Sequence, residues 1–156
     1  MGLFSSLKNF VTGGGAEVSL ELLDAPVRGN DFGVRVTAVV GDADIDIERV
    51  YLRVRGAEHV EIPDVEVVKK KAGGSIETEK RTITHQESTF RHDAELVAAM
   101  TLKAGETYSW ETVVEIPEDV LPTFKGRKAR HEWRALAGLD MRGNDPDSGW
   151  VDFEID

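Results

Sequence analysis

Apolar and polar residues alternate along most of the chain after residue 16. Val18, Leu20 and Leu22 share one parity, and a second apolar set occupies the even positions of residues 32–40. Because successive side chains of a strand point to opposite faces of its sheet, each run predicts a strand with one buried face. Residues 25–31 contain Pro, Gly, Asn and Asp, which predicts the turn between the two strands.

The next apolar run changes parity within a few residues. Ile45 and Ile47 occupy odd positions, whereas the apolar residues from Val50 onward occupy even ones. An extra residue near Glu48 and Arg49 explains the change, because a bulge adds one residue to one strand of a pair. We therefore expect one long strand with a bulge or corner at this point.

Residues 60–84 have the pattern of a hairpin. Residues 60–68 alternate outward to the tip at Lys69–Lys71, the Ala-Gly-Gly-Ser segment at 72–75 predicts the turn, and residues 76–84 return. The returning segment is largely polar, so we expect it at the edge of a sheet.

Further alternating runs complete an all-β pattern. They predict strands within residues 90–100, 108–116, 128–142 and 150–155. Eight or nine strands with almost no helix predict one domain over residues 16–156, an antiparallel two-sheet β-sandwich of the immunoglobulin-like kind.

The first 15 residues have a different pattern. Leu3, Phe4, Leu7 and Phe10 lie at helical spacing, and three glycines at 13–15 follow. This predicts a short amphipathic helix and a glycine hinge over residues 1–15. Its apolar side has three open interpretations: docking on its own sandwich, binding in a partner's groove, or contact with a membrane interface.

Composition narrows the classes of function. Acidic residues outnumber basic ones, 29 to 19, and the resulting net charge of −10 opposes binding to nucleic acid. The chain has no cysteine and no run of 18 apolar residues, and its start lacks the pattern of a secretory signal. We therefore expect a cytoplasmic protein.

No arrangement of residues indicates catalysis, a cofactor or a metal. His92 and His131 lie on the apolar parity of their strands, which favours hydrogen-bonded core or rim histidines over metal ligands. The oxygen-rich loop of residues 140–149 would suit calcium, but it does not match the EF-hand spacing, so turn formation is the stronger interpretation. Its candidate ligands are Asp140, Asn144, Asp145 and Asp147.

A locally basic row lies within this acidic chain. Lys128, Arg130 and Arg134 share the outward parity of the longest predicted strand, with Glu132 between them. They are candidate partner-binding residues, together with the N-terminal apolar set, and a solvated strand face is the alternative.

The order of segments over residues 102–147 resembles the arrestin-like sandwich of the bacterial and archaeal sporulation-control protein family. The best marker is Leu121-Pro122-Thr123-Phe124-Lys125-Gly126, which stands between a strand ending in Ile116-Pro117 and the long alternating strand. Proline fixes φ and Gly126 permits a tight turn, so the local chemistry agrees with a link between two strands.

The resemblance implies a non-enzymatic adaptor or scaffold that binds a protein partner. A second copy joined through the polar edge near residues 76–84, or through the N-terminal helix, is one form of partner. The chain ends about where a first sandwich should end, so it is either a minimal member of that family or a fragment. A small-ligand or calcium-binding sandwich module is the alternative function.

Overall fold

The computed structural model describes residues 12–13, 15–143 and 145–156, and the secondary-structure elements in these ranges are all strands. The predicted N-terminal helix therefore lies outside the described residues, which begin at Thr12. The described residues contain no helix long and apolar enough to cross a membrane. The strands are β1 (Thr12–Gly13), β2 (Ala16–Leu22), β3 (Asp31–Val40), β4 (Ile45–Lys70), β5 (Ile76–Val97), β6 (Met100–Leu102), β7 (Thr107–Glu115), β8 (Phe124–Lys125), β9 (Ala129–Met141) and β10 (Val151–Phe153).

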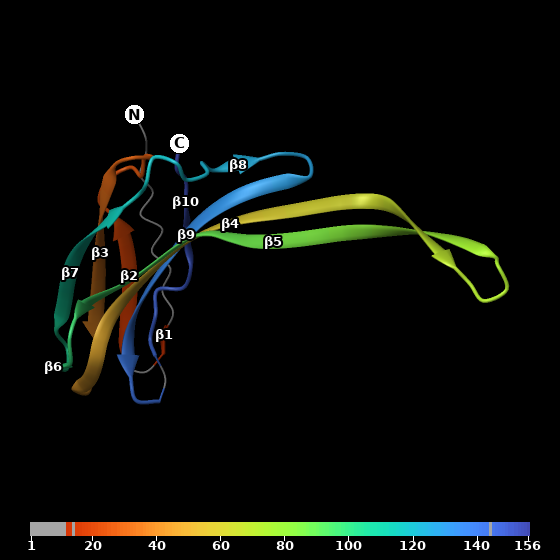
Figure 1. Ribbon diagram of the computed structural model, residues 1–156. Coiled ribbons are helices and arrows are strands. Elements are labelled where there is room, and N and C mark those ends of the chain that lie inside the picture. Colours follow the sequence, from red (N-terminus) through yellow and green to blue (C-terminus); the bar gives the residue numbers. More distant parts are fainter. Residues whose placement is uncertain (1–11, 14, 144) are drawn as a thin grey trace.

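Two antiparallel sheets pack face to face (Figure 1). Sheet A has the order β1-β2-β3-β7, and sheet B has the order β10-β9-β4-β5, with β6 added to β4 and β8 to β9. The core between them is made of alternate residues from both sheets, so the predicted all-β sandwich is confirmed. At its start, Thr12 and Gly13 pair with Glu17 and Ala16, so the chain turns back tightly at the glycines.

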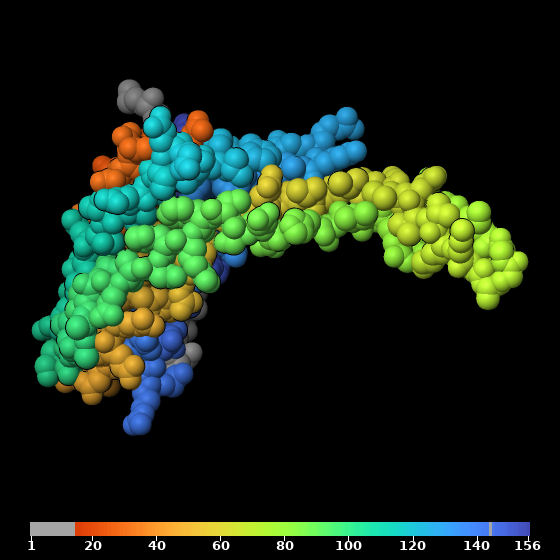
Figure 2. Space-filling model, viewed as in Figure 1, coloured from red at the N-terminus to blue at the C-terminus, as the bar shows by residue number. Residues whose placement is uncertain are grey.

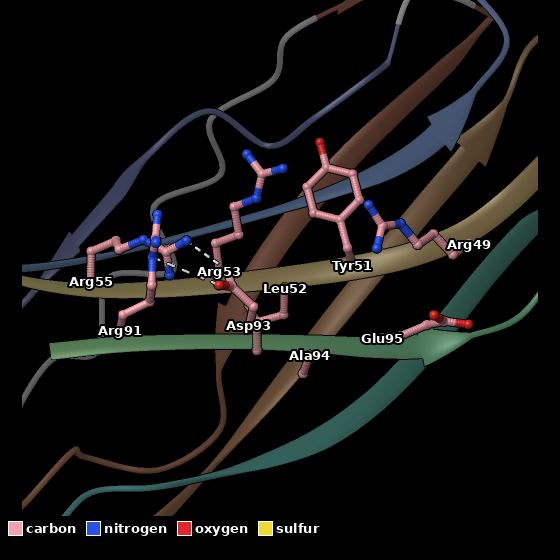
Figure 3. Close-up of a pocket in the computed structure, with 9 residues that line it drawn as sticks. All are labelled: Arg49, Tyr51, Leu52, Arg53, Arg55, Arg91, Asp93, Ala94 and Glu95. Atoms are coloured by element: carbon pink, nitrogen blue, oxygen red, sulfur yellow. Dashed lines mark hydrogen bonds and ion pairs between the residues drawn. The ribbon is translucent and has the colours of Figure 1, made fainter.

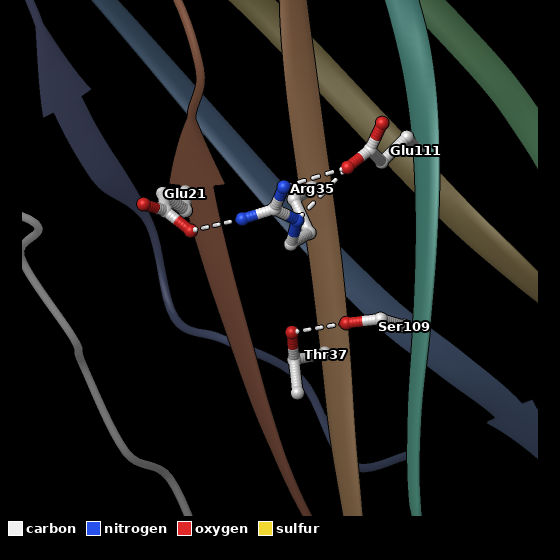
Figure 4. Close-up of polar contacts among 5 residues, drawn as sticks. All are labelled: Glu21, Arg35, Thr37, Ser109 and Glu111. Carbon is white, nitrogen blue, oxygen red and sulfur yellow. Dashed lines mark hydrogen bonds and ion pairs between the residues drawn. The ribbon is translucent and has the colours of Figure 1, made fainter.

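Strand β3 shows how the alternating pattern produces the core. Its apolar even-numbered residues, from Phe32 to Val40, are at most 3% exposed. Its odd-numbered residues face solvent on the outside of sheet A, where Arg35 bridges Glu21 and Glu111 (Figure 4). The guanidinium Nη2 lies 2.7 Å from the Glu111 carboxylate. This face is polar and exposed, so its ion pairs contribute little to stability.

Strands β4 and β5 are much longer than the sequence pattern predicts. They have 26 and 22 residues and form one continuous hairpin, where we expected several shorter strands. The register between them shifts three times, between Val50/Tyr51, Gly56/Ala57 and Ile62/Val65. The first two shifts add a residue to β5 and the third adds one to β4, so each reverses the parity of the strand that carries the extra residue, and one strand has the pattern of several.

Two details of the prediction can be checked against the register. The expected bulge near Glu48 and Arg49 is confirmed, because the pairing of β4 with β9 shifts between Ile47 and Arg49. The final strand is shorter than expected, since β10 covers only Val151–Phe153. The expected edge position of the returning hairpin segment is also confirmed, because β5 is the last strand in the order of sheet B.

Candidate protein-binding surface

The outer part of the long hairpin leaves the sandwich altogether. Strand β9 pairs with β4 only as far as the Val60–Ala129 pair, and beyond it β4 and β5 continue alone to Lys70 and Ile76. Figures 1 and 2 show this two-stranded segment, residues 61–84, projecting from the body of the protein; we call it the arm. Ten residues of β4 and nine of β5, at about 3.3 Å each, give it a length of roughly 30 Å.

Local sequence explains why the arm forms a ribbon. At its tip the Lys71 amide donates a hydrogen bond to the Ser75 carbonyl at 2.9 Å, and Gly73 and Gly74 take positive φ values of 101° and 84°. Ion pairs join the two strands nearby: Lys71 with Glu77 at 2.9 Å, and Lys69 with Glu79 at 3.0 Å.

Glu79 is the most strongly perturbed carboxyl group of the arm. Hydrogen bonds from Arg81 and then Lys69 lower its pKa to about 2, because both cations favour the ionised form. The carboxylate therefore stays charged across the physiological range and keeps both contacts.

One face of the arm carries an apolar row. Pro63 and Asp64 form the bulge of β4 in the register shift between Ile62 and Val65, and Asp64 has a φ of 57°. The extra residue places Ile62 and Val65 on the same face, and Ile83 stands opposite Ile62. The row continues the core-facing side of β4, but no second sheet covers it among the described residues. It consists of Val60, Ile62, Val65, Val67 and Ile83.

The arm also has two free edges. Strand β5 pairs only with β4 in the described structure, so its outer edge is open along Ile76–Val97. The outer edge of β4 is free beyond Glu61. The Glu61 amide donates to the carbonyl of Lys128, the residue just before β9, at 2.7 Å. Free edges present unpaired N–H and C=O groups that another strand can pair with.

The root of the arm is fixed to the core by aromatic packing. The Trp133 indole donates to the Leu121 carbonyl at 3.0 Å, and its ring lies 5.2 Å from that of Phe90. Gly56 is packed so closely that a Cβ there would lie 3.0–3.2 Å from Thr89, Phe90 and Trp133. The root is therefore anchored, whereas the arm beyond it has only its own two strands.

The predicted core histidine at position 131 lies in this root. His131 is fully buried, its Nε2 lies 2.6 Å from the Thr89 hydroxyl, and its ring stacks on Phe124. Burial lowers its pKa below the ordinary value, because the imidazolium form loses its hydration. The described residues contain no group of three or more His, Asp or Glu side chains able to hold a metal.

The sequence-predicted partner residues lie in three places. Lys128 and Arg130 border a depression of about 240 Å³ at the root of the arm, and Arg130 pairs with Glu132 at 2.8 Å. Arg134 lies further along β9, with its guanidinium 4.4 Å from the centre of the Trp150 ring. The N-terminal set of Leu3, Phe4, Leu7 and Phe10 lies outside the described residues.

The described carboxylates of the oxygen-rich loop serve the turn itself. Asp145 accepts a hydrogen bond from the Met141 amide at 3.0 Å, and Asp147 accepts one from the Gly149 amide at 2.7 Å. Asp140 instead pairs with Arg49 at 2.8 Å. These contacts are those of turn-forming residues.

Sequence reasoning missed the arm as a projecting body. The hairpin pattern of residues 60–84 predicted its two strands, but not that β9 ends before them. The signal that was available is the small number of apolar residues in 76–84, since a strand covered by a second sheet needs one apolar face.

Comparison with known proteins identifies the fold. No protein-family model and no curated protein matches the sequence. Among solved structures, Spo0M, a sporulation control protein from Bacillus subtilis, superposes with a TM-score of 0.59 and 19% identity over 92% of this chain. The alignment covers 50% of the Spo0M chain, so this protein spans half its length. The chain therefore has the arrestin-like sandwich fold of the sporulation control protein Spo0M, as its segment order predicted.

Proposed function

We propose that this protein is a non-enzymatic adaptor that binds a protein partner through the arm and the open edge of β5. The observation that carries the proposal is the arm itself, a ribbon with an uncovered apolar row and two unpaired edges. A two-stranded ribbon is only marginally stable by itself in water, and a third strand or a packed layer supplies what it lacks.

Strand addition is the binding mode that suits this surface. A partner strand beside β5 would form main-chain hydrogen bonds, and the side chains of alternate residues would determine its specificity. Val68 and Ile76 lie on the face of the arm opposite the apolar row and are 62% and 66% exposed. A partner that packed on this face would bury them. A second copy of this chain is one such partner, because an open edge can pair with its own copy.

The comparison supports a regulatory role over a catalytic one. Spo0M is described as a sporulation control protein, and it shares the sandwich that carries the arm here. The Thr89 hydroxyl at the root lies beside the His131 imidazole, but that ring is fully buried between Phe124 and Trp133, so binding is the function that the exposed chemistry of the arm supports.

Site-specific crosslinking tests the proposal. A photo-reactive amino acid replaces Val68 on the arm, and the matched control replaces Val113 on the outer face of sheet A, which is 58% exposed. We expect ultraviolet light in cells to produce adducts from position 68 and not from position 113. Mass spectrometry of the adduct would show whether it contains another protein or a second copy.

A variant with a shortened arm provides the second part of the experiment. Ile62 and Ile83 are directly paired, so an Asn-Gly turn can join them in place of residues 63–82. We expect the shortened protein to fold. We also expect it no longer to bind the partner that crosslinking identifies, as measured with the purified partner. Equal adducts at both positions, or full partner binding by the shortened protein, would refute the proposal.

A further inference from the structure

Three arginines stand side by side across three neighbouring strands on the outer face of sheet B. Arg55 of β4 pairs directly with Arg134 of β9 on one side and with Arg91 of β5 on the other. Residues directly opposite in an antiparallel pair share a face, so all three guanidinium groups are on one surface. We call Arg134, Arg55 and Arg91 the arginine row.

Like charges opposite each other destabilise a sheet. Repulsion within the arginine row therefore lowers the stability of sheet B unless an anionic group lies nearby. Asp93 supplies part of this counter-charge, with its carboxylate 2.6 Å from Arg55 and 3.8 Å from Arg91. Asp152 stands opposite Arg134 in the register, yet no ion pair joins them in the described part of the chain. The row is therefore only partly neutralised in a protein whose net charge is −10.

Arg53 adds a further cation to the same face. It has no carboxylate within ion-pair distance among the described residues, and its guanidinium lies 4.9 Å from the centre of the Tyr51 ring. Arg55 is held differently, since its Nη1 donates to the carbonyls of Val54 and His92 at 2.9 and 3.0 Å. Arg55 is thus fixed by the backbone, whereas Arg53 and Arg91 keep free donors.

These side chains border a shallow pocket of about 600 Å³ between β4 and β5 (Figure 3). Figure 3 shows Arg53, Arg55 and Arg91 on the same side of the two strands, with Glu95 at the far end beyond Tyr51. Glu95 repels an anion at that end, so a ligand would be drawn to the end occupied by Arg55 and Arg91. The pocket is far larger than a single ion needs and is open to solvent, which suits part of a longer chain.

The spacing of the cations defines the ligand. Arg53 stands opposite Asp93, so Arg53 and Arg91 are diagonal neighbours on one face, about 7–8 Å apart. Alternate residues of an extended peptide repeat at a similar distance of about 6.6 Å. Guanidinium groups bind carboxylates with paired hydrogen bonds, and the groups of two neighbouring arginines can share one carboxylate. A peptide with acidic residues at alternate positions would match this surface.

We propose that the pocket bordered by Arg53, Arg55 and Arg91 binds an extended acidic peptide segment with Asp or Glu at every second position. This rests on the proposed function in one respect, namely that the segment belongs to a protein partner. The site is separate from the arm, so the two proposals can fail independently.

Fluorescence anisotropy at low salt tests the proposal with two labelled peptides of equal charge. One has glutamate at every second position, separated by serine, and the other has the same glutamates in adjacent pairs. We expect the full chain to bind the alternating peptide more tightly, because only its carboxylates reach Arg53 and Arg91 together. The binding should weaken as salt is added, since exposed charges are screened.

Variants of the full chain show where the peptide binds. We expect the double variant R53Q/R91Q to weaken binding by about tenfold or more, because each charge-assisted contact is lost. R127Q/K80Q removes the same charge elsewhere and should bind as the unaltered chain does. R53Q/R91Q should also melt close to the unaltered chain, because both side chains are exposed and losing Arg91 removes its repulsion from Arg55, so lost binding cannot be ascribed to unfolding.

Several results would overturn the inference. Equal affinity for both peptides, or an equal loss in R127Q/K80Q, would place the binding elsewhere or make it general charge attraction. Association with phosphatidylserine vesicles without peptide binding would replace the peptide with a membrane surface. The shortened-arm protein should still bind the alternating peptide, and R53Q/R91Q should still crosslink at position 68, which separates this inference from the proposed function.

Discussion

Replacing Gly138 by alanine tests the close packing of sheet B at a single atom. Gly138 of β9 lies directly opposite Tyr51 of β4. A Cβ at position 138 would overlap the Tyr51 hydroxyl oxygen and would lie 2.6 Å from its Cζ. Tyr51 is only 8% exposed, and the guanidinium carbons of Arg49 and Arg53 lie 5.8 and 4.9 Å from its ring centre, so its ring has little room to move.

The net effect is a balance of two terms. Overpacking of this kind costs about 1–3 kcal/mol. Alanine is better than glycine within a strand by about 0.5–1 kcal/mol, because glycine loses more backbone entropy on folding. Subtracting one from the other, we expect Gly138→Ala to lower the free energy of unfolding by about 1 kcal/mol, within a range of about 0–2.5 kcal/mol. At this chain length about 1 kcal/mol is a fall of about 2–4 °C in Tm.

A double-mutant cycle separates the two terms. Tyr51→Leu keeps apolar cover over β9 and removes the ring atoms that the new methyl group would meet. In that background we expect Gly138→Ala to raise the free energy of unfolding by about 0.5–1 kcal/mol, so its sign reverses. Urea denaturation of all four proteins measures the cycle. The same sign in both backgrounds would show that Tyr51 is not the obstacle.

Two further predictions concern the core and its titration. Burial lowers the pKa of His131 below 6.5, so between that lowered pKa and 6.5 the folded state binds fewer protons than the unfolded one. Stability should therefore fall as pH drops below about 6.5 toward the folded-state pKa. Urea denaturation at several pH values should show a smaller fall for H131Q, and an equal fall would refute this reasoning. Leu52 is fully buried, so L52A should cost about 2–5 kcal/mol by the same measurement, whereas V68A, at an exposed position, should change stability little.

Much of the sandwich could be predicted because its strands have one buried face. In β3 and the first part of β9 alternate residues are buried, so alternation identified most of the buried set, but not Leu136 of β9, which is buried on the opposite parity. The same logic placed the bulge near Glu48, where the parity changes once. Periodicity predicts structure well wherever a second sheet forces each strand to have one apolar side.

The arm and the arginine row could not be predicted for two different physical reasons. Three register shifts divided the pattern of β4 and β5 into apparently separate strands, and no second layer required the arm to keep an apolar face. The row depends on which residue of one strand stands opposite which residue of another. Arg55, Arg91 and Arg134 are far apart in the chain, and only the pairing of β4 with β5 and β9 brings them together.

The long hairpin also determines the order in which the chain can fold. Its two strands are joined by the short turn at Lys71–Ser75, so their contacts near the tip are local. Closing the sandwich requires distant partners, since Arg35 meets Glu111 across 76 residues and Arg49 meets Asp140 across 91. High contact order slows folding, so we expect the hairpin to form early and the sheets to close late. During that interval the outer edges of β4 and β5 are open to other chains. Folding at high concentration therefore competes with aggregation.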